Sequence, residues 1–257
     1  MRPLVYAHRG GAALAPENTI AAFDHGLAVG ADGLELDVRL AADGVPVVIH
    51  DATLDRTTNA TGPVAARASG ELAALDAGYR FAVEGGFPCR ARGIGVPRLD
   101  EVLRRYPETP LIIEFKEDSA ALAKAAVDAV RAAGAIERTV LASFRTGVLL
   151  AVRRRSREIR TGPTPGEVRS ALMRSWCGLA PRNPAYVSFQ IPETWGRLRV
   201  VSRRFVRAAA RANLPVHVWV VNAESDMRRL LDWGVSGLVT DRPDIAVPLV
   251  RALRPAP

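Results

Sequence analysis

The sequence is poor in several features that define specialised classes of protein. It has only two cysteines, Cys89 and Cys177, which are too few for a disulfide framework and lack the spacing of a zinc site, so we expect both to be packing residues. No apolar run approaches the roughly 18 to 20 residues that a membrane span requires, and the opening segment is too short for a signal peptide. The sequence therefore predicts a cytoplasmic protein with no stable membrane insertion.

Lysine is almost absent, although the chain is strongly basic. Only Lys116 and Lys124 are lysines among 35 basic residues, and the formal net charge is +8. This charge fits a nucleic acid, a membrane surface or an anionic small molecule as partner. The basic residues are spread along the chain without a nucleic-acid-binding module, so we expect no nucleic acid, and we interpret the densest run, at 153–157, as a solvated helix face. Nothing in the sequence indicates an oligomeric state.

The remaining composition is that of an ordinary globular protein of 257 residues, with 48% hydrophobic and 24% charged residues. Short runs rich in Val, Ile and Leu predict strands at 4–7, 34–38, 111–115, 139–143, 159–162, 186–190, 216–221 and 238–240. Helical patterns lie between most of them, for example at 19–29, 119–133, 203–212 and 223–233, with starts at Asn18 and Ser119. Eight alternating units favour one α/β domain over 1–257, a TIM-type (β/α)8 barrel.

Two segments interrupt this alternation. The pair Asp43-Gly44 lies between two apolar runs and predicts a hairpin. A two-residue loop would place Asp37 directly opposite His50. The second interruption, at about 52–97, lacks a strand-helix rhythm, and we interpret it as an insertion after the second barrel strand that covers one end of the barrel without a core of its own.

Carboxylates cluster on the predicted strands. Glu35 and Asp37 share one face of their strand, and Glu114 lies on the next strand of the barrel. Three carboxylates that converge inside a barrel repel one another unless a hard cation binds, so they are candidate ligands for Mg²⁺ or Ca²⁺, with Mn²⁺ as a further option. The alternative is an internal salt-bridge layer with Arg9 and Lys116.

Histidine is scarce, and two of the four histidines accompany these carboxylates. His8 ends the first strand and His50 ends the predicted hairpin, so the two imidazoles are candidates for a general acid and a general base. Arg9 and Lys116 suit the oxygens of a phosphate. Together these groups predict phosphoester cleavage, whereas His217 is expected to be a hydrogen-bonded interior residue.

Ordered motifs along the chain resemble the glycerophosphodiester phosphodiesterase family. They are His8-Arg9-Gly10, Glu35-Leu36-Asp37, His50-Asp51, Leu54-Asp55-Arg56-Thr57-Thr58, Glu114-Phe115-Lys116, Trp219-Val220-Val221-Asn222 and Thr240-Asp241-Arg242-Pro243. The resemblance implies a TIM-type barrel with an inserted segment, and hydrolysis of glycerophosphodiesters to glycerol 3-phosphate and an alcohol with a divalent cation.

The resemblance also implies individual roles. Glu35, Asp37 and Glu114 match the metal ligands, His8 and His50 the acid/base pair, and Arg9 and Lys116 the phosphate contacts. Trp219 is expected to line the substrate pocket. Asn18 is better explained as a helix cap, and Asp241 as the end of a strand that caps the next helix.

Alternatives remain at the sequence level. The same chemistry on a lysophospholipid would make the chain a lysophospholipase D, and loss of turnover would make it a barrel that binds phosphorylated ligands. Within the main interpretation, the nucleophile is water or the 2-hydroxyl of the substrate glycerol, and either histidine can be the base.

Overall fold

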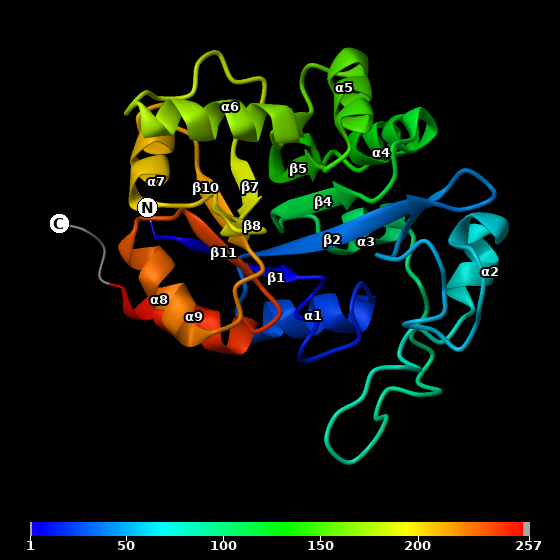
Figure 1. Ribbon diagram of the computed structural model, residues 1–257. Helices are drawn as coiled ribbons and strands as arrows, with labels where there is room; N and C mark the ends of the chain where they lie inside the picture. The colour runs from blue at the N-terminus through cyan, green and yellow to red at the C-terminus, as the bar shows by residue number, and fades with distance from the viewer. Residues whose placement is uncertain (1, 254–257) are drawn as a thin grey trace.

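A curled parallel sheet surrounded by helices forms the centre of the computed structural model, which describes residues 2–253 (Figure 1). Within that range, eight parallel strands follow the order β6-β5-β4-β2-β1-β11-β10-β7. Their bounds are β1 Leu4–His8, β2 Gly33–Leu40, β4 Leu111–Phe115, β5 Thr139–Ala142, β6 Arg160–Thr161, β7 Phe189–Pro192, β10 Val216–Trp219 and β11 Gly237–Thr240. β6 approaches the residues that precede β7 where the Val187 amide donates to the Thr161 carbonyl over 3.1 Å. The TIM-type barrel is thus confirmed.

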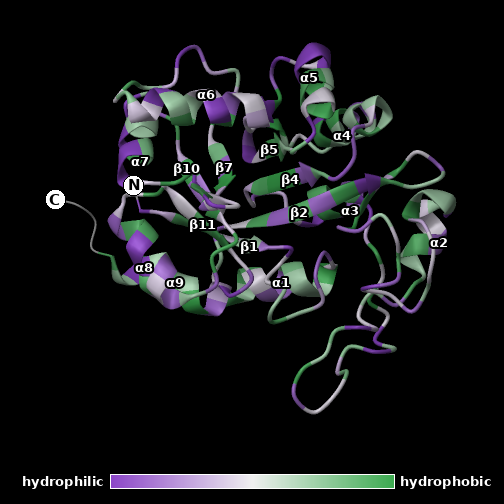
Figure 2. Ribbon diagram, in the orientation of Figure 1, coloured by the Kyte–Doolittle hydropathy of each residue, from purple (hydrophilic) through white to green (hydrophobic). Residues whose placement is uncertain are grey.

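Each parallel strand is followed by a helix on the outside of the sheet. These helices are α1 Ile20–Val29, α3 Leu99–Arg105, α4 Ala120–Ala132, α5 Thr146–Arg155, α6 Pro165–Trp176, α7 Arg203–Ala210, α8 Glu224–Asp232 and α9 Pro243–Ala252. In Figure 2, α6 alternates hydrophobic and hydrophilic residues, as expected for a helix with one face on the sheet. Among the described residues, no helix has the length and apolar character needed to cross a bilayer.

The interior of the barrel is built in layers, because every second residue of a strand points inward. Tyr6, Ile112 and Val239 form a buried apolar cluster. Two residues further along the same three strands, toward their carboxyl ends, the chain places His8, Glu114 and Asp241. The apolar cluster therefore lies beneath a polar layer at the carboxyl ends of the strands. The candidate site is in this polar layer.

The predicted strands are reproduced, with one clear displacement. The run at 186–190 was expected to be a strand, but β7 begins at Phe189. The Tyr186 ring packs on the Phe189 ring with centroids 5.0 Å apart, so this aromatic residue belongs to the buried core although it precedes the ladder.

The β2–β3 hairpin forms, but its predicted register is wrong by one residue. In β3 (Pro46–Val48), Val48 pairs with Val38, and the Ile49 amide donates to the Asp37 carbonyl over 3.0 Å. The loop contains three residues, and Gly44 adopts a φ of 77°, a conformation that favours glycine. Asp37 therefore lies opposite Ile49 rather than His50.

The segment after this hairpin contains η1 (Val64–Ala66) and α2 (Ser69–Ala73) and lies to one side of the barrel in Figure 1. It shares a small hydrophobic cluster with the hairpin, and no cluster is built from the residues of this segment alone among the described residues. The cluster consists of Ala41, Val47, Ile49, Leu54, Val64, Leu72, Ala77 and Val96. Because Val47 belongs to β3, this cluster attaches the segment to the hairpin that precedes His50.

Two other expectations hold only in part. Cys177 is exposed at the end of α6, whereas Cys89 is partly buried, so only Cys89 fits a packing role. The arginine run is only partly a solvated face, because Arg153 donates to both carboxylate oxygens of Glu167 at 2.8 and 3.0 Å and so connects α5 to α6.

His217 is buried as expected, but the expected hydrogen bond is missing at Nδ1, which has no partner among the described residues. Burial lowers the pKa of His217 from 6.5 to about 4. The unfolded chain therefore binds the proton more tightly, so this group's contribution to stability is present above pH 6.5 and is lost as the pH falls toward 4. The loss amounts to about 3 kcal/mol.

We expect His217→Phe to reduce this acid destabilisation. Urea unfolding of the wild type and the variant at pH 7 and pH 4.5 measures the effect as a smaller fall in the free energy of unfolding for the variant. His25→Gln, on the exposed side of α1, is the control. An equal fall in wild type and His217→Phe would contradict the assignment.

Candidate active site

Strand register brings the predicted site residues together at the carboxyl ends of β1, β2 and β4. His8 pairs with Glu35 across β1 and β2, and Asp37 pairs with Glu114 across β2 and β4. Lys116 follows β4 directly, and its amide donates to the Val38 carbonyl over 3.2 Å. Side chains far apart in the sequence therefore share one face of the sheet.

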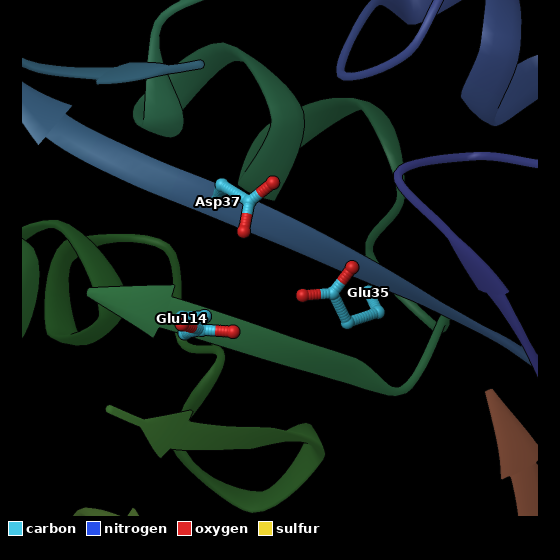
Figure 3. A group of neighbouring side chains, drawn as sticks. All are labelled: Glu35, Asp37 and Glu114. Carbon is cyan, nitrogen blue, oxygen red and sulfur yellow. The ribbon is translucent and has the colours of Figure 1, made fainter. Parts of the chain in front are cut away.

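The three predicted ligand residues form a compact carboxylate cluster. Glu35, Asp37 and Glu114 each offer an oxygen within 4.8 Å of the others, and Figure 3 shows Glu35 and Asp37 on β2 beside Glu114 on β4. Burial and the neighbouring Asp37 charge raise the pKa of Glu35 to about 8. At neutral pH the cluster thus favours retention of a proton on Glu35 unless another positive charge is present.

Arg9 and Lys116 supply part of that positive charge. Arg9 Nε lies 3.0 Å from Asp37 Oδ2, and Lys116 Nζ lies 3.0 Å from Asp37 Oδ1 and 2.8 Å from Glu114 Oε1. Burial opposes ionisation of Asp37, but these two cations outweigh it and lower the pKa of Asp37. The salt-bridge layer considered from the sequence is therefore present around Asp37.

Glu35 is outside this layer. Its Oε2 accepts a hydrogen bond from the Arg9 backbone amide at 3.2 Å, and His8 Nε2 is 3.8 Å away. Its carboxyl therefore has no ion pair with an arginine or lysine side chain among the described residues. An all-oxygen cluster with this deficit of positive charge fits a hard divalent cation.

Each candidate acid/base histidine is held by a carboxylate. The distance between Nδ1 and a carboxylate oxygen is 2.6 Å both for His8 with Asp241 and for His50 with Asp51. These contacts orient the rings and leave Nε2 available for a substrate. Burial lowers the pKa of His8, but Glu35 and Asp241 outweigh it and raise this pKa. Burial lowers the pKa of His50, and in this case it prevails.

Asp241 is a site residue that the sequence interpretation missed. Its Oδ2 accepts from Asn222 Nδ2 at 2.8 Å, and its amide donates to Asn222 Oδ1 over 2.9 Å. The expected helix cap is wrong, because the residue that caps α9 is Arg242, without a side-chain hydrogen bond. The motif containing Asp241, two residues beyond an inward-facing valine, was the available signal.

Asn18 was also assigned the wrong role. Thr19 caps α1 by accepting from the Ala22 amide. Asn18 donates to Asp37 Oδ2 at 2.8 Å and accepts from the Asp37 amide at 3.2 Å. It therefore fixes the orientation of a predicted metal ligand.

Arg56 connects the segment after β3 to the site. It donates to Asp51 at 2.6 Å and to the two carboxylate oxygens of Glu17 at 2.7 and 2.8 Å. Glu17 also accepts from Arg9 at 2.9 Å. This arginine thus connects the carboxylate partner of His50 to a partner of Arg9.

A cavity of about 810 Å³ opens onto these groups. His8, Arg9, Glu35, His50, Glu114 and Lys116 line its charged end. Trp219 also lines it, and its ring is edge-on to Phe144 with centroids 5.4 Å apart. The predicted site residues other than the fully buried Asp37 thus face one continuous space.

Comparison with known proteins identifies the family. The sequence model of the glycerophosphoryl diester phosphodiesterase family matches residues 8–245. The chain belongs to this family. The predicted class of enzyme, a phosphoric diester hydrolase, is confirmed.

Individual relatives cover almost the full chain. A glycerophosphodiester phosphodiesterase of Caldanaerobacter subterraneus subsp. tengcongensis is 32% identical over 98% of this chain and 99% of its own. The crystal structure of a glycerophosphodiester phosphodiesterase from Agrobacterium tumefaciens matches with a TM-score of 0.78 at 33% identity, over 96% of this chain and 100% of that one. An Oleispira antarctica phosphodiesterase, solved with its product sn-glycerol-3-phosphate, has a TM-score of 0.78 at 23% identity, with 98% of each chain covered.

Proposed function

We propose that the chain hydrolyses glycerophosphodiesters to glycerol 3-phosphate and an alcohol, with His8 and His50 as the acid/base pair and a divalent cation as cofactor. The observation that carries this proposal is the presence of two carboxylate-held imidazoles and a buried carboxylate cluster around one cavity. The product bound to the Oleispira antarctica relative supports a small-molecule substrate of this kind.

Arg9 and Lys116 would bind the phosphodiester. Their side chains are only 16% and 14% exposed, so both act in a medium of reduced dielectric constant, and both line the cavity. The planar guanidinium of Arg9 is suited to two phosphate oxygens, whereas Lys116 supplies a point charge. Their present ion pairs with Asp37 and Glu114 keep them aimed into the cluster.

Glu35, Asp37 and Glu114 would hold the cation, with Mg²⁺, Ca²⁺ and Mn²⁺ as the candidates. When bound, such an ion supplies charge neutralisation for the phosphate oxygens. Asn18 holds Asp37, and the Arg9 amide holds Glu35, so the chain orients two of the three carboxylates by itself.

The two histidines would move the protons. One imidazole removes a proton from the nucleophile, either water or the glycerol 2-hydroxyl, and the other donates a proton to the departing alkoxide as its bond to phosphorus breaks. Attack by the 2-hydroxyl gives a cyclic phosphate, which water then opens. Both routes consume one water molecule. Asp241 would stabilise the positively charged form of His8, and Asp51 would stabilise that of His50.

The first test is turnover of glycerophosphocholine with and without metal. We expect release of glycerol 3-phosphate and choline in Mg²⁺, Ca²⁺ or Mn²⁺, and a loss of about 100-fold or more after EDTA treatment that added metal restores, because Glu35 and its neighbours need a counter-charge. Chromatography of the products also detects any cyclic phosphate. Tight binding without product in every metal would contradict the proposal and favour a binding role.

A further inference from the structure

The cavity extends well beyond the charged cluster, and its second half is apolar. One side of this extension is a two-stranded hairpin, β8 (Thr194–Trp195) and β9 (Leu198–Arg199), which directly follows β7. The loop after β5 completes it with Phe144, and the end of β10 completes it with Trp219. We call Phe144, Trp195, Leu198 and Trp219 the apolar wall.

The apolar wall exposes large side chains that a folded chain would otherwise bury. Trp195 is 62% exposed and Phe144 is 39% exposed. Their rings nevertheless contact each other, with centroids 5.6 Å apart, and Phe144 also contacts Trp219. A contiguous apolar surface at the mouth of a reactive cavity is typical of a ligand-binding surface.

The hairpin that carries Trp195 is anchored at its base. Glu193 accepts from Arg229 on α8 at 2.6 and 2.9 Å, and its backbone carbonyl accepts from the Val200 and Val201 amides. The turn places Gly196 at a φ of 57°, which a two-residue hairpin loop requires. The wall is thus preformed, so a ligand does not have to order it.

Charge identifies the kind of ligand. The acidic residues that line the cavity are Glu35 and Glu114, both in the carboxylate cluster, whereas Arg145 and Arg169 add positive charge to the rest of the lining. A cationic group such as choline would therefore meet arginines there. The rings of Phe144, Trp195 and Trp219 pack on one another rather than surrounding a space, so they do not form a cage for a quaternary ammonium.

We propose that the apolar wall is a subsite for an alkyl or acyl chain carried by the glycerophosphodiester. This inference rests on the proposed function, because the phosphate would lie at the charged end while the uncharged chain extends along Trp195 and Leu198. The preferred substrate would then combine an anionic diester with an apolar substituent, attached either to the glycerol or to the alcohol.

Two substrate series test the subsite, each below its critical micelle concentration. One series carries acyl chains of increasing length on the glycerol of glycerophosphocholine, and the other carries alkyl esters of increasing length on glycerol 3-phosphate. We expect kcat/KM to rise with chain length in one series, by up to about fourfold for each buried methylene. The series that responds identifies the side that bears the chain.

Variants of the wall provide the residue-level test. Trp195→Ala and Phe144→Ala should each lower the ratio of kcat/KM for the longest over the shortest substrate by about tenfold, since each removes a large apolar contact. Trp176→Ala is the matched control, because Trp176 is 52% exposed on α6 and lies outside the cavity lining. This control should keep the wild-type ratio.

The possible failures can be distinguished. Cleavage of glycerophosphocholine with no chain-length dependence in either series would overturn the subsite and leave the proposed function intact. The same conclusion would follow if turnover of the long-chain substrates rose only above the critical micelle concentration, because that result indicates docking on a lipid surface. If no substrate is cleaved, calorimetric titration compares the binding of decyl phosphate and methyl phosphate and so tests the subsite without turnover. Tighter binding of decyl phosphate that Trp195→Ala weakens supports the subsite, and equal binding overturns it.

Discussion

Replacing His50 by glutamine is expected to lower kcat for glycerophosphocholine by about 10²- to 10⁴-fold, the usual contribution of a positioned general acid or base. The same loss is expected for His8→Gln. Each imidazole is oriented at Nδ1 by a carboxylate at 2.6 Å, and glutamine cannot relay a proton from the same position. Steady-state kinetics with measured thermal unfolding separates this loss from a folding defect.

The pH profile of an Asp241→Asn variant assigns the two histidines. The charge and hydrogen bond of Asp241 help to raise the pKa of His8, so their removal lowers that pKa. The limb of the kcat/KM profile that belongs to His8 should therefore move to lower pH, while the limb set by His50 stays in place. His25→Gln is the matched control, since His25 is exposed on α1.

Near-normal turnover in His8→Gln or His50→Gln would remove that residue from the mechanism.

The sequence predicts the barrel and its charged layer because both depend on simple periodicities. Strands with alternating faces place Glu35 and Asp37 on one side, and the register that pairs Asp37 with Glu114 follows from neighbouring parallel strands. The identities of His8 and His50 as a pair were predictable for the same reason. His8 ends β1 and His50 lies two residues beyond β3, so both follow from strands that the hydrophobic pattern already defines.

The supporting residues could not be predicted in this way, because their roles depend on tertiary contacts. Asn18 is of a residue type that commonly caps helices and lies just before one, yet it has a φ of 58° and binds Asp37 instead. Asp241 and Asn222 are far from His8 in the sequence, and only the pairing of β1 with β11 brings them together. A single extra loop residue, Ala42, likewise shifted the hairpin register.

The apolar wall shows a different limit of sequence patterns. The hairpin strands have only two residues each, too short for a period to be recognised. Trp195 stands between Thr194 and Gly196, so no continuous apolar run indicates a groove there. Its partner Phe144 lies on another loop, so the groove exists only after folding.

A second large effect is expected at Glu35. Glu35→Gln should abolish the metal-dependent part of turnover and weaken divalent-metal binding by about 100-fold or more, because one of three carboxylate ligands loses its charge. Its effect on the metal-free fold should be small, since the raised pKa of about 8 leaves the wild-type carboxyl protonated at neutral pH. Asp37→Asn should behave differently, because it removes the buried charge that pairs with Arg9 and Lys116 and is expected to cost about 3 to 5 kcal/mol of stability.

Stability as a function of pH tests the same assignment without turnover. In EDTA, the folded wild type keeps its Glu35 proton up to about pH 8, whereas the unfolded chain loses it near 4.5. Stability is therefore expected to fall as the pH rises between those values, and Glu35→Gln should lack this fall. Metal at one hundred times its Kd should add about 2.7 kcal/mol to the wild type and little to Glu35→Gln. Glu117→Gln, which lies outside the carboxylate cluster, is the matched control, and equal stabilisation of Glu35→Gln and wild type by metal would place the cation elsewhere.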